Sequence, residues 1–173
     1  IAASAGLARL AVSRQPRIAV VSTGDELVEP GQPGLTHQVR RSNAYGLGAA
    51  LTLAGFAPAT DLHLPDREDE LRAAFARELA RQDVLVLSGG VSAGRYDFVP
   101  AALAACGVRR VFHQVSQRPG RPLWFGTHAG GALVFALPGN PVSVPVCTAR
   151  FALPALAALT AAPRPPQPRA APA

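Results

Sequence analysis

Short apolar runs alternate along the chain with longer segments in which apolar residues recur every three or four positions. The short runs are typical of buried β-strands, and the periodic segments are typical of helices that bury one face. The runs lie at residues 17–22, 57–64, 83–87, 108–116 and 122–137. The last two regions predict two or three strands, with a hairpin turn where two glycines interrupt the final run.

Helical segments follow most of these strands. Ser42 opens the first, and the second begins after Asp66, with acidic residues in its first turn and arginines in its last, as the helix dipole favours. A third helix follows a glycine-rich turn at 88–94. The last helix should run from about 141 to 159, where Pro154 is expected to kink it or split it in two.

This order of elements predicts an α/β fold: a three-layer sandwich around a mostly parallel sheet. In such sheets ligands bind beyond the carboxyl ends of the strands. Polar and glycine-rich segments directly follow predicted strands, at 23–26, Asp66, 88–97 and 138–143. We therefore expect these segments to converge at one edge of the sheet.

The composition is that of a folded chain. Of 173 residues 49% are apolar and 16% charged, which is too apolar for a disordered protein. No apolar run reaches the roughly 18 residues of a membrane span, so we expect no membrane partner. Residues 17–160 should form one domain, 1–16 a connecting segment from a missing upstream region, and the Pro/Ala-rich residues 161–173 a linker or tail.

The net charge is +6, and all 17 basic residues are arginine. Part of this excess of positive charge lies outside residues 17–160. Nucleic-acid-binding surfaces are typically basic runs interleaved with aromatic residues, and the sequence has no such run. We expect no nucleic-acid partner. Cys106 and Cys147 lack the spacing of a zinc site or a disulfide framework, which favours a reducing, cytoplasmic location.

Ser88-Gly89-Gly90 follows the clearest predicted strand. Glycines at such a turn let backbone N–H groups approach a phosphate closely. The same glycines are equally expected in a tight turn that needs positive φ. Neither the phosphate loop with a Gly-Lys-Ser/Thr end nor the dinucleotide fingerprint is present, so the turn alone does not choose between the two interpretations.

Carboxylates also gather after the predicted strands. Glu26 and Asp97 are placed to hold Mg²⁺, which takes few carboxylates together with water and a substrate phosphate. Asp97, Asp66 and Ser42 each precede a helix, however, and from spacing alone helix capping is the favoured interpretation for all three. Glu26 has no such structural role.

Two further segments offer anion-binding groups. Arg118 and Arg121 flank a Pro-Gly turn, and guanidinium groups bind oxyanions in pairs, although a solvated loop is equally compatible. Residues 138–143 lead into the last helix with free N–H groups and the Ser143 hydroxyl. A simple helix entry with proline in the first turn is the alternative.

Together these segments resemble the MoeA/gephyrin E-domain family of molybdopterin molybdenumtransferases. The matching motifs are Ser-Thr-Gly-Asp-Glu-Leu at 22–27, Ser-Gly-Gly-Val-Ser at 88–92, Arg-Pro-Gly-Arg-Pro at 118–122 and Leu-Pro-Gly-Asn-Pro-Val-Ser at 137–143. The resemblance covers about residues 12–160. It implies the molybdopterin-binding, MogA-like fold and the Mg²⁺-dependent insertion of molybdate into adenylylated molybdopterin, with release of AMP.

The resemblance also implies roles for individual residues. Glu26, Asp66 and Asp97 would be catalytic, and Glu26 and Asp97 would bind Mg²⁺. The implied substrate-binding residues are Thr23, Ser42, Asn43, Ser88, Gly89, Gly90, Ser92, Arg118, Arg121, Pro138, Gly139, Asn140, Pro141 and Ser143. The full-length protein would be a homodimer with a site shared between subunits.

The chain departs from the family pattern at two positions. Arg41 stands where family members often carry an acid or asparagine, and Tyr96 stands where a basic residue often precedes the motif aspartate. Because molybdate is an anion, the second change puts one local molybdate contact in doubt.

Two other functions stay open. A MogA-type molybdopterin adenylyltransferase shares the fold, but that group usually carries Gly-Gly-Thr-Gly after the third strand, where this chain has Gly-Gly-Val-Ser. A non-enzymatic module for molybdopterin binding or assembly is the other alternative, and an exposed apolar face on the 141–159 helix would favour it.

Overall fold

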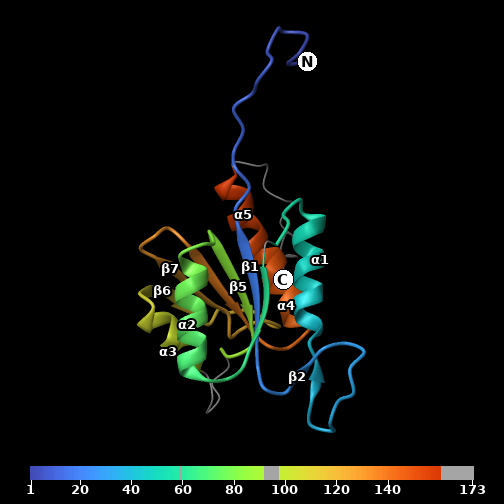
Figure 1. The fold of residues 1–173 in the computed structure, drawn as a ribbon, viewed down its shortest axis with the longest axis vertical. Coiled ribbons are helices and arrows are strands. Elements are labelled where there is room, and N and C mark those ends of the chain that lie inside the picture. The colour runs from blue at the N-terminus through green and yellow to red at the C-terminus, as the bar shows by residue number, and fades with distance from the viewer. Residues whose placement is uncertain (59, 92–97, 161–173) are drawn as a thin grey trace, which may run out of the picture.

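A single six-stranded sheet organises the computed structural model, which describes residues 1–58, 60–91 and 98–160 (Figure 1). The strand order is β4-β1-β5-β8-β7-β6. The strands are β1 (Ile18–Thr23), β4 (Thr60–Leu64), β5 (Val84–Ser88), β6 (Val108–His113), β7 (Trp124–His128) and β8 (Leu133–Leu137). β4, β1, β5 and β8 are parallel, whereas β7 is antiparallel to both β6 and β8. The mostly parallel sheet is therefore confirmed.

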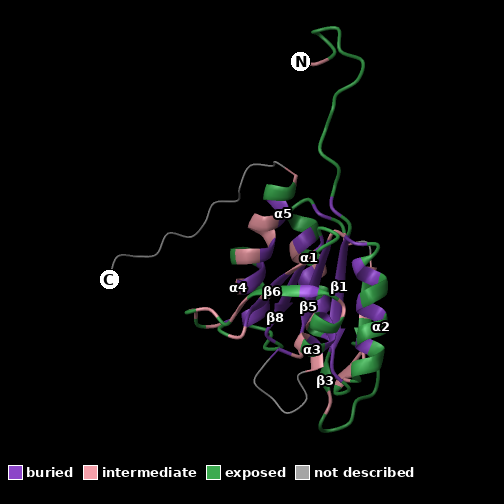
Figure 2. Cartoon of the chain, turned by 90° about the vertical axis from the view of Figure 1, so that its left-hand side faces the viewer, coloured by how far each residue is buried: buried purple, intermediate pink, exposed green. Residues whose placement is uncertain are grey.

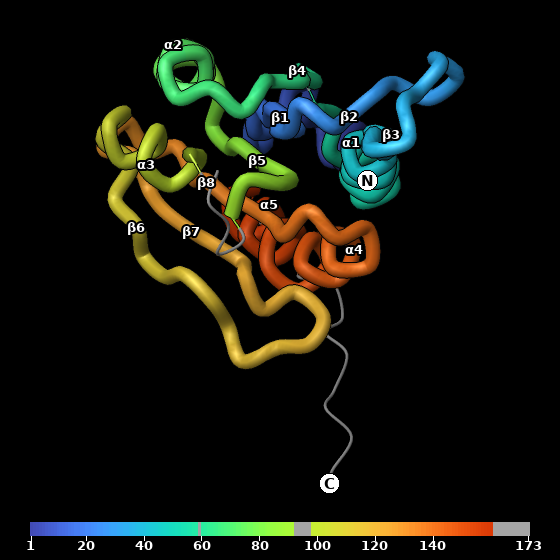
Figure 3. The backbone as a smooth tube through the Cα atoms, turned by 90° about the horizontal axis from the view of Figure 1, so that it is seen from below, coloured from blue at the N-terminus to red at the C-terminus, as the bar shows by residue number. Residues whose placement is uncertain are grey.

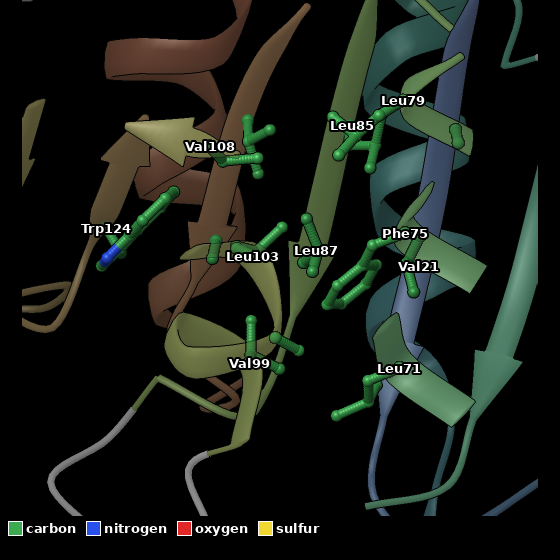
Figure 4. Packing of buried hydrophobic residues seen from close by; sticks show 14 of the residues in the cluster. Val21, Leu71, Phe75, Leu79, Leu85, Leu87, Val99, Leu103, Val108 and Trp124 are labelled. Atoms are coloured by element: carbon green, nitrogen blue, oxygen red, sulfur yellow. The ribbon is translucent and has the colours of Figure 1, made fainter. Parts of the chain in front are cut away.

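Helices cover both faces of the sheet, which gives the predicted three layers. On one face lie α2 (Glu68–Leu79) and α3 (Phe98–Ala105); on the other lie α1 (Ser42–Leu53), α4 (Ser143–Cys147) and α5 (Leu153–Leu159). Alternate residues of a strand point to opposite faces, so Val21 packs under α2 and Val20 under α1. Figure 2 shows the resulting buried sheet, and Figure 4 shows Phe75 of α2 against Leu87 of β5.

The last helical region is split, as Pro154 predicts. α4 and α5 are joined by a π-helical turn over Thr148–Ala152, and Pro154 lies in the first turn of α5. Proline lacks the N–H that a continuous helix needs, and its ring crowds the preceding turn. The wider turn accommodates this break. In the part of the chain that is described, no helix combines the length and apolarity needed to cross a membrane.

One small element differs from expectation. Pro30, Gly31, Pro33 and Gly34 predict a loop over residues 30–41, but the excursion between β1 and α1 is closed by two short parallel strands, β2 (Leu27–Val28) and β3 (Val39–Arg40). The Val39 N–H donates to the Glu26 carbonyl at 2.9 Å, and the Arg41 N–H donates to the Val28 carbonyl at 3.0 Å. Strands of this length carry no readable alternation in the sequence.

Candidate functional site

The topology leaves a crevice at the carboxyl ends of β1 and β5. The chain leaves β1 towards α1 on one face of the sheet, whereas α3, the helix after β5, lies on the other face. Helices on opposite faces leave the ends of the two neighbouring strands uncovered. Figure 3 looks onto this end of the sheet. A cleft of about 160 Å³ lies here, lined by Ser22, Thr23, Glu26, Leu27, Val39, Arg40, Arg41, Ser42, Asn43, Ser88, Gly89 and Gly139.

The floor of the cleft contains hydroxyl groups without partners. Ser22 of β1 and Ser88 of β5 are register partners, so their side chains project from the same face of the sheet. Ser22 and Thr23 are 1% and 3% exposed, and among the described residues neither Ser22 Oγ nor Thr23 Oγ1 has a hydrogen-bond partner. Buried hydroxyls are normally satisfied. These two hydroxyls are therefore candidates for contact with a bound molecule.

The turn after β5 requires its glycines. Gly89 and Gly90 have φ of +97° and +65°. A Cβ at Gly89 would lie 2.7 Å from the Thr23 carbonyl oxygen, and one at Gly90 would lie 2.4 Å from Val99 Cγ2 and 2.9 Å from Thr23 Oγ1. The tight-turn interpretation of the motif is confirmed, and phosphate binding at this turn stays a prediction. The turn needs positive φ, and it brings bare backbone against the Thr23 hydroxyl at the cleft.

One wall of the cleft joins α1 to the segment before α4. Asn43 Nδ2 donates to the Gly139 carbonyl at 2.8 Å. Asn140 Oδ1 accepts from the Val142 N–H at 2.8 Å, which shapes the turn into α4. Ser42 is the first residue of α1 and lines the cleft, with Arg41 at the capping position and no side-chain cap. Ser42 is thus not the cap that its spacing suggested.

The segment before α4 contributes unequally. Gly139 lines the cleft, but Pro138 and Ser143 are buried and do not, and Asn140 and Pro141 are exposed. Gly90 also lies behind the cleft lining rather than in it.

Of the predicted acidic residues, Glu26 lines the cleft. Its carboxylate folds back over the preceding turn, since a Cβ at Gly24 would lie 2.6 Å from Glu26 Oε2. Asp66 is partly buried after β4, two residues before α2 begins, and is not in the cleft lining. The end of β4 is nevertheless tied to the same turn, because His63 Nε2 donates to the Gly24 carbonyl at 2.9 Å. Ser92 and Asp97 lie outside the described residues.

The predicted arginine pair lies apart from the cleft lining. Arg118 and Arg121 are exposed on the connection from β6 to β7 and border a separate hollow of about 510 Å³. The turn between them is packed on α4, because a Cβ at Gly120 would lie 2.5 Å from Cys147 Sγ. Cys147 Sγ donates to the Gly120 carbonyl at 3.7 Å. The pair is therefore held beside the helix that follows the cleft wall.

Comparison with known proteins identifies the family of this chain. The model of a family described as "Probable molybdopterin binding domain" matches residues 19–158. The chain belongs to this family. Among curated relatives, the molybdopterin molybdenumtransferase of Synechocystis is 40% identical over 154 residues, covering 88% of this chain and 40% of the relative. Molybdopterin molybdenumtransferase 2 of Mycobacterium tuberculosis is 38% identical, covering 90% of this chain and 40% of the relative. The chain thus spans about two fifths of the relatives' length.

Solved structures agree on the fold. The molybdopterin biosynthesis MoeA protein of Pyrococcus horikoshii superposes with a TM-score of 0.72 at 27% identity, over 86% of this chain and 36% of that protein. The molybdopterin biosynthesis enzyme MoaB of Thermus thermophilus superposes with a TM-score of 0.65 over 87% of this chain and 99% of that protein. At 20% identity the second likeness shows the MogA-like fold alone.

The molybdopterin-binding domain also has a charged cluster around Arg41 of the cleft lining, which the sequence analysis did not predict. Arg41 is 6% exposed; its Nη1 donates to Glu29 Oε1 at 2.8 Å, and its Nη2 donates to Asp61 and to the Leu62 carbonyl. Hydrogen bonds from Arg41 and from the Tyr45 hydroxyl hold the pKa of Glu29 below its ordinary value. Glu29 and Asp61 stand 12 and 20 residues from Arg41, so no local spacing signals this cluster.

Proposed function

We propose that this chain is the molybdopterin-binding part of a molybdopterin molybdenumtransferase. Such an enzyme inserts molybdate into adenylylated molybdopterin and releases AMP. The observation that carries the proposal is the cleft between β1 and β5, where the glycine turn, Glu26 and two hydroxyls without a partner in the described part of the chain meet. Curated relatives with this name are 36–40% identical to the chain, which supports the same assignment.

The floor of the cleft suits a phosphate group. Backbone N–H groups of a positive-φ glycine turn point outward and bind anions. The Thr23 hydroxyl lies against this turn, Ser22 is the register partner of Ser88 just before the turn, and Asn43 fixes the opposite wall through Gly139. We assign the phosphate of the adenylylated pterin to this floor, with Ser88 and Gly89 as its nearest neighbours in the lining.

Magnesium fits this site through Glu26. Among the described residues no group of three His, Cys, Asp or Glu side chains converges on one point. Mg²⁺ needs no such group, because it usually takes one or two carboxylates and completes its shell with water and substrate phosphate oxygens. Glu26 in the cleft lining supplies one carboxylate, and Asp97 is the proposed second. Bound Mg²⁺ would neutralise charge on the phosphates as AMP leaves.

We assign molybdate to the arginine pair and the start of α4. Arg118 and Arg121 offer planar guanidinium donors to a tetrahedral dianion, and Ser143 begins α4, the helix on whose Cys147 the turn between the two arginines packs. Packing of Gly120 on Cys147 connects this hollow to α4 and, through the preceding segment, to the cleft wall at Gly139. Asp66 at the end of β4 would act on the phosphate side of the site.

Release of AMP from adenylylated molybdopterin in the presence of Mg²⁺ and molybdate tests the proposal. We expect Glu26→Gln and Asp97→Asn to keep the fold and to lose AMP release by a factor of about 100 or more, as removal of one charged site group commonly does. Glu68→Gln is the matched control, because Glu68 is an exposed carboxylate in the first turn of α2. Chelation of Mg²⁺ should lower the wild-type rate to that of Glu26→Gln. Unchanged AMP release in both site variants would reject the assignment.

The assay needs two forms of the protein, because the chain spans only part of its relatives. It should be run on the chain alone and on the chain joined to the flanking regions of the Synechocystis relative. We propose that the complete enzyme is a cytoplasmic homodimer whose site is shared between subunits, so the joined form should turn over faster. Formation of adenylylated molybdopterin from ATP, in place of AMP release, would instead indicate the adenylyltransferase.

Exposed apolar side chains on and near the helices of one face of the sheet keep a binding or assembly role as the second candidate. Val142 before α4 is 65% exposed and Leu159 of α5 is 47% exposed, and α1 exposes Tyr45 and Leu53. Contiguous exposed apolar patches mark protein contacts, so this candidate requires these side chains to be covered by one partner surface. Molybdopterin binding without AMP release in either form of the protein would favour this candidate over the transferase.

A further inference from the structure

A buried arginine stands on the wall of the cleft without a role in the proposed chemistry. Arg41 directly precedes α1, and 6% of its side chain is exposed. Nη1 donates to Glu29 Oε1 at 2.8 Å, and Nη2 donates to the Asp61 carboxylate and to the Leu62 carbonyl, the latter at 3.3 Å. Burial of a guanidinium is costly unless it is paired, and here two carboxylates surround it.

The partners of Arg41 belong to different parts of the fold. Glu29 lies in the excursion between β1 and α1, just after β2, whereas Asp61 and Leu62 lie on β4, at the edge of the sheet. The Tyr45 hydroxyl from α1 donates to the second oxygen of Glu29 at 2.9 Å. A single side chain therefore ties the excursion to the sheet edge and to the start of α1.

This excursion carries one wall of the cleft. Glu26 stands at its beginning, and Ser42 and Asn43 follow its end; all three line the cleft. The Val39 N–H donates to the Glu26 carbonyl, and Asn43 reaches across to Gly139. A shift of the excursion relative to β4 would therefore move the Glu26 carboxylate and the Asn43 amide together.

We propose that Arg41 is a positioning residue: its three-way pairing clamps the excursion to β4 and fixes Glu26 and Asn43 at the cleft. The inference rests on the proposed function only in the choice of ligand, since the clamp itself is a property of the unliganded chain. Lysine at this position keeps the charge, but it lacks the planar fork that reaches two carboxylates and a carbonyl.

Amide hydrogen exchange in the unliganded protein tests the clamp directly. Arg41→Met should speed exchange of the Val39 amide about tenfold, because loss of a charge-assisted bond loosens the local structure by that order. Arg41→Lys should give an intermediate rate, and Glu29→Gln a smaller increase. Arg17→Met is the matched control, since Arg17 pairs with Asp83 at the opposite end of the sheet. Unchanged Val39 exchange in Arg41→Met and Arg41→Lys, with the fold intact by circular dichroism, would overturn the proposal.

Binding of adenylylated molybdopterin separates this inference from the proposed function. We expect Arg41→Met to weaken affinity about tenfold and the Arg41→Met/Glu29→Gln double variant to weaken it no further, as coupled residues do. Weak binding by Arg41→Met with unchanged Val39 exchange would overturn positioning, because it indicates direct contact with the ligand. If the wild-type protein does not bind this ligand but Arg41→Met still speeds exchange, the clamp stands and the proposed function fails.

Discussion

The polar groups at the two ends of the central strands differ in whether they have hydrogen-bond partners. At the amino end, Asp83 before β5 accepts from Arg14 Nη1 at 2.6 Å and from the Arg17 N–H at 2.7 Å. At the carboxyl end, the hydroxyls of Ser22 and Thr23 are buried, and neither has a partner within the described residues. Both ends are made by the same strands, so the difference does not come from the sheet itself.

From this difference we expect the amino end of the strand pair to contribute to stability and the carboxyl end to contribute to binding. The pairing around Asp83 fastens residues 14–17 to the start of β5, and the pKa of Asp83 is far below its ordinary value because Arg14 and Arg17 donate to it. Unsatisfied donors at the other end destabilise the unliganded protein. A group that persists at such a cost is better explained by a bound partner than by the fold. Substitutions at the two ends should therefore affect different measurements.

The largest effect is expected at the glycine turn. Gly90→Ala adds a Cβ 2.4 Å from Val99 Cγ2 at a φ of +65°, so strain and overpacking combine. We expect a loss of about 2–4 kcal/mol in the free energy of unfolding, together with loss of pterin binding. Gly131→Ala is the matched control: its φ is +91°, but nothing lies within 4 Å of the added Cβ. It should lose about 1 kcal/mol and bind normally. Equal losses in urea unfolding would show that the turn is not specially packed.

A smaller effect is expected at the amino end. Asp83→Ala removes the acceptor of Arg14 and Arg17, so the free energy of unfolding should fall by about 1–3 kcal/mol. Affinity for adenylylated molybdopterin, measured by calorimetry on the folded variant, should stay unchanged. A loss of affinity at equal folding would mean that the two ends are coupled and would undo the comparison.

The same carboxylate gives this end a pH signature. The pKa of Asp83 is lowered in the folded chain, chiefly by the Arg14 side chain, from an ordinary value of 3.8. Its stabilising contribution is therefore complete above that value and disappears as pH falls through the lower, folded-state pKa. The difference in unfolding free energy between wild type and Asp83→Ala should be constant above about pH 5 and shrink steadily below about pH 4. A difference that grows on acidification would contradict the pairing.

The sequence predicts the residues at the carboxyl ends of the strands better than it predicts the residues in the walls of the cleft. Thr23 ends β1 and Gly89 directly follows β5, and each strand begins with a run of four apolar residues, so the place of Thr23 and Gly89 at the sheet edge follows from the strands alone. The three-layer fold follows from the same alternation of strands and helices, and the structure confirms it. Local pattern is sufficient wherever position along a strand fixes position in space.

The remaining residues depend on how distant segments pack. Arg118 and Arg121 stand on a turn whose place is set by contact with Cys147, and the sequence between them carries no sign of that contact. Arg41 is buried although it is charged, because Glu29 and Asp61 approach it from separate elements that no local pattern connects. The catalytic and substrate-binding roles of the cleft residues stay predictions.

The smallest effect, and the sharpest contrast, is expected at Ser22. Ser22 is 1% exposed, and its hydroxyl has no hydrogen-bond partner among the described residues. Ser22→Ala therefore removes a desolvated group without breaking a hydrogen bond. The free energy of unfolding should stay unchanged or rise by up to about 1 kcal/mol, whereas phosphate-dependent binding of the pterin should weaken severalfold. Thr52→Ala is the control, because Thr52 lies on the exposed side of α1 and its hydroxyl already donates to the Gly48 carbonyl at 2.8 Å. A loss of stability in Ser22→Ala with unaltered affinity would mean that this hydroxyl serves the fold, and that the carboxyl end is as structural as the amino end.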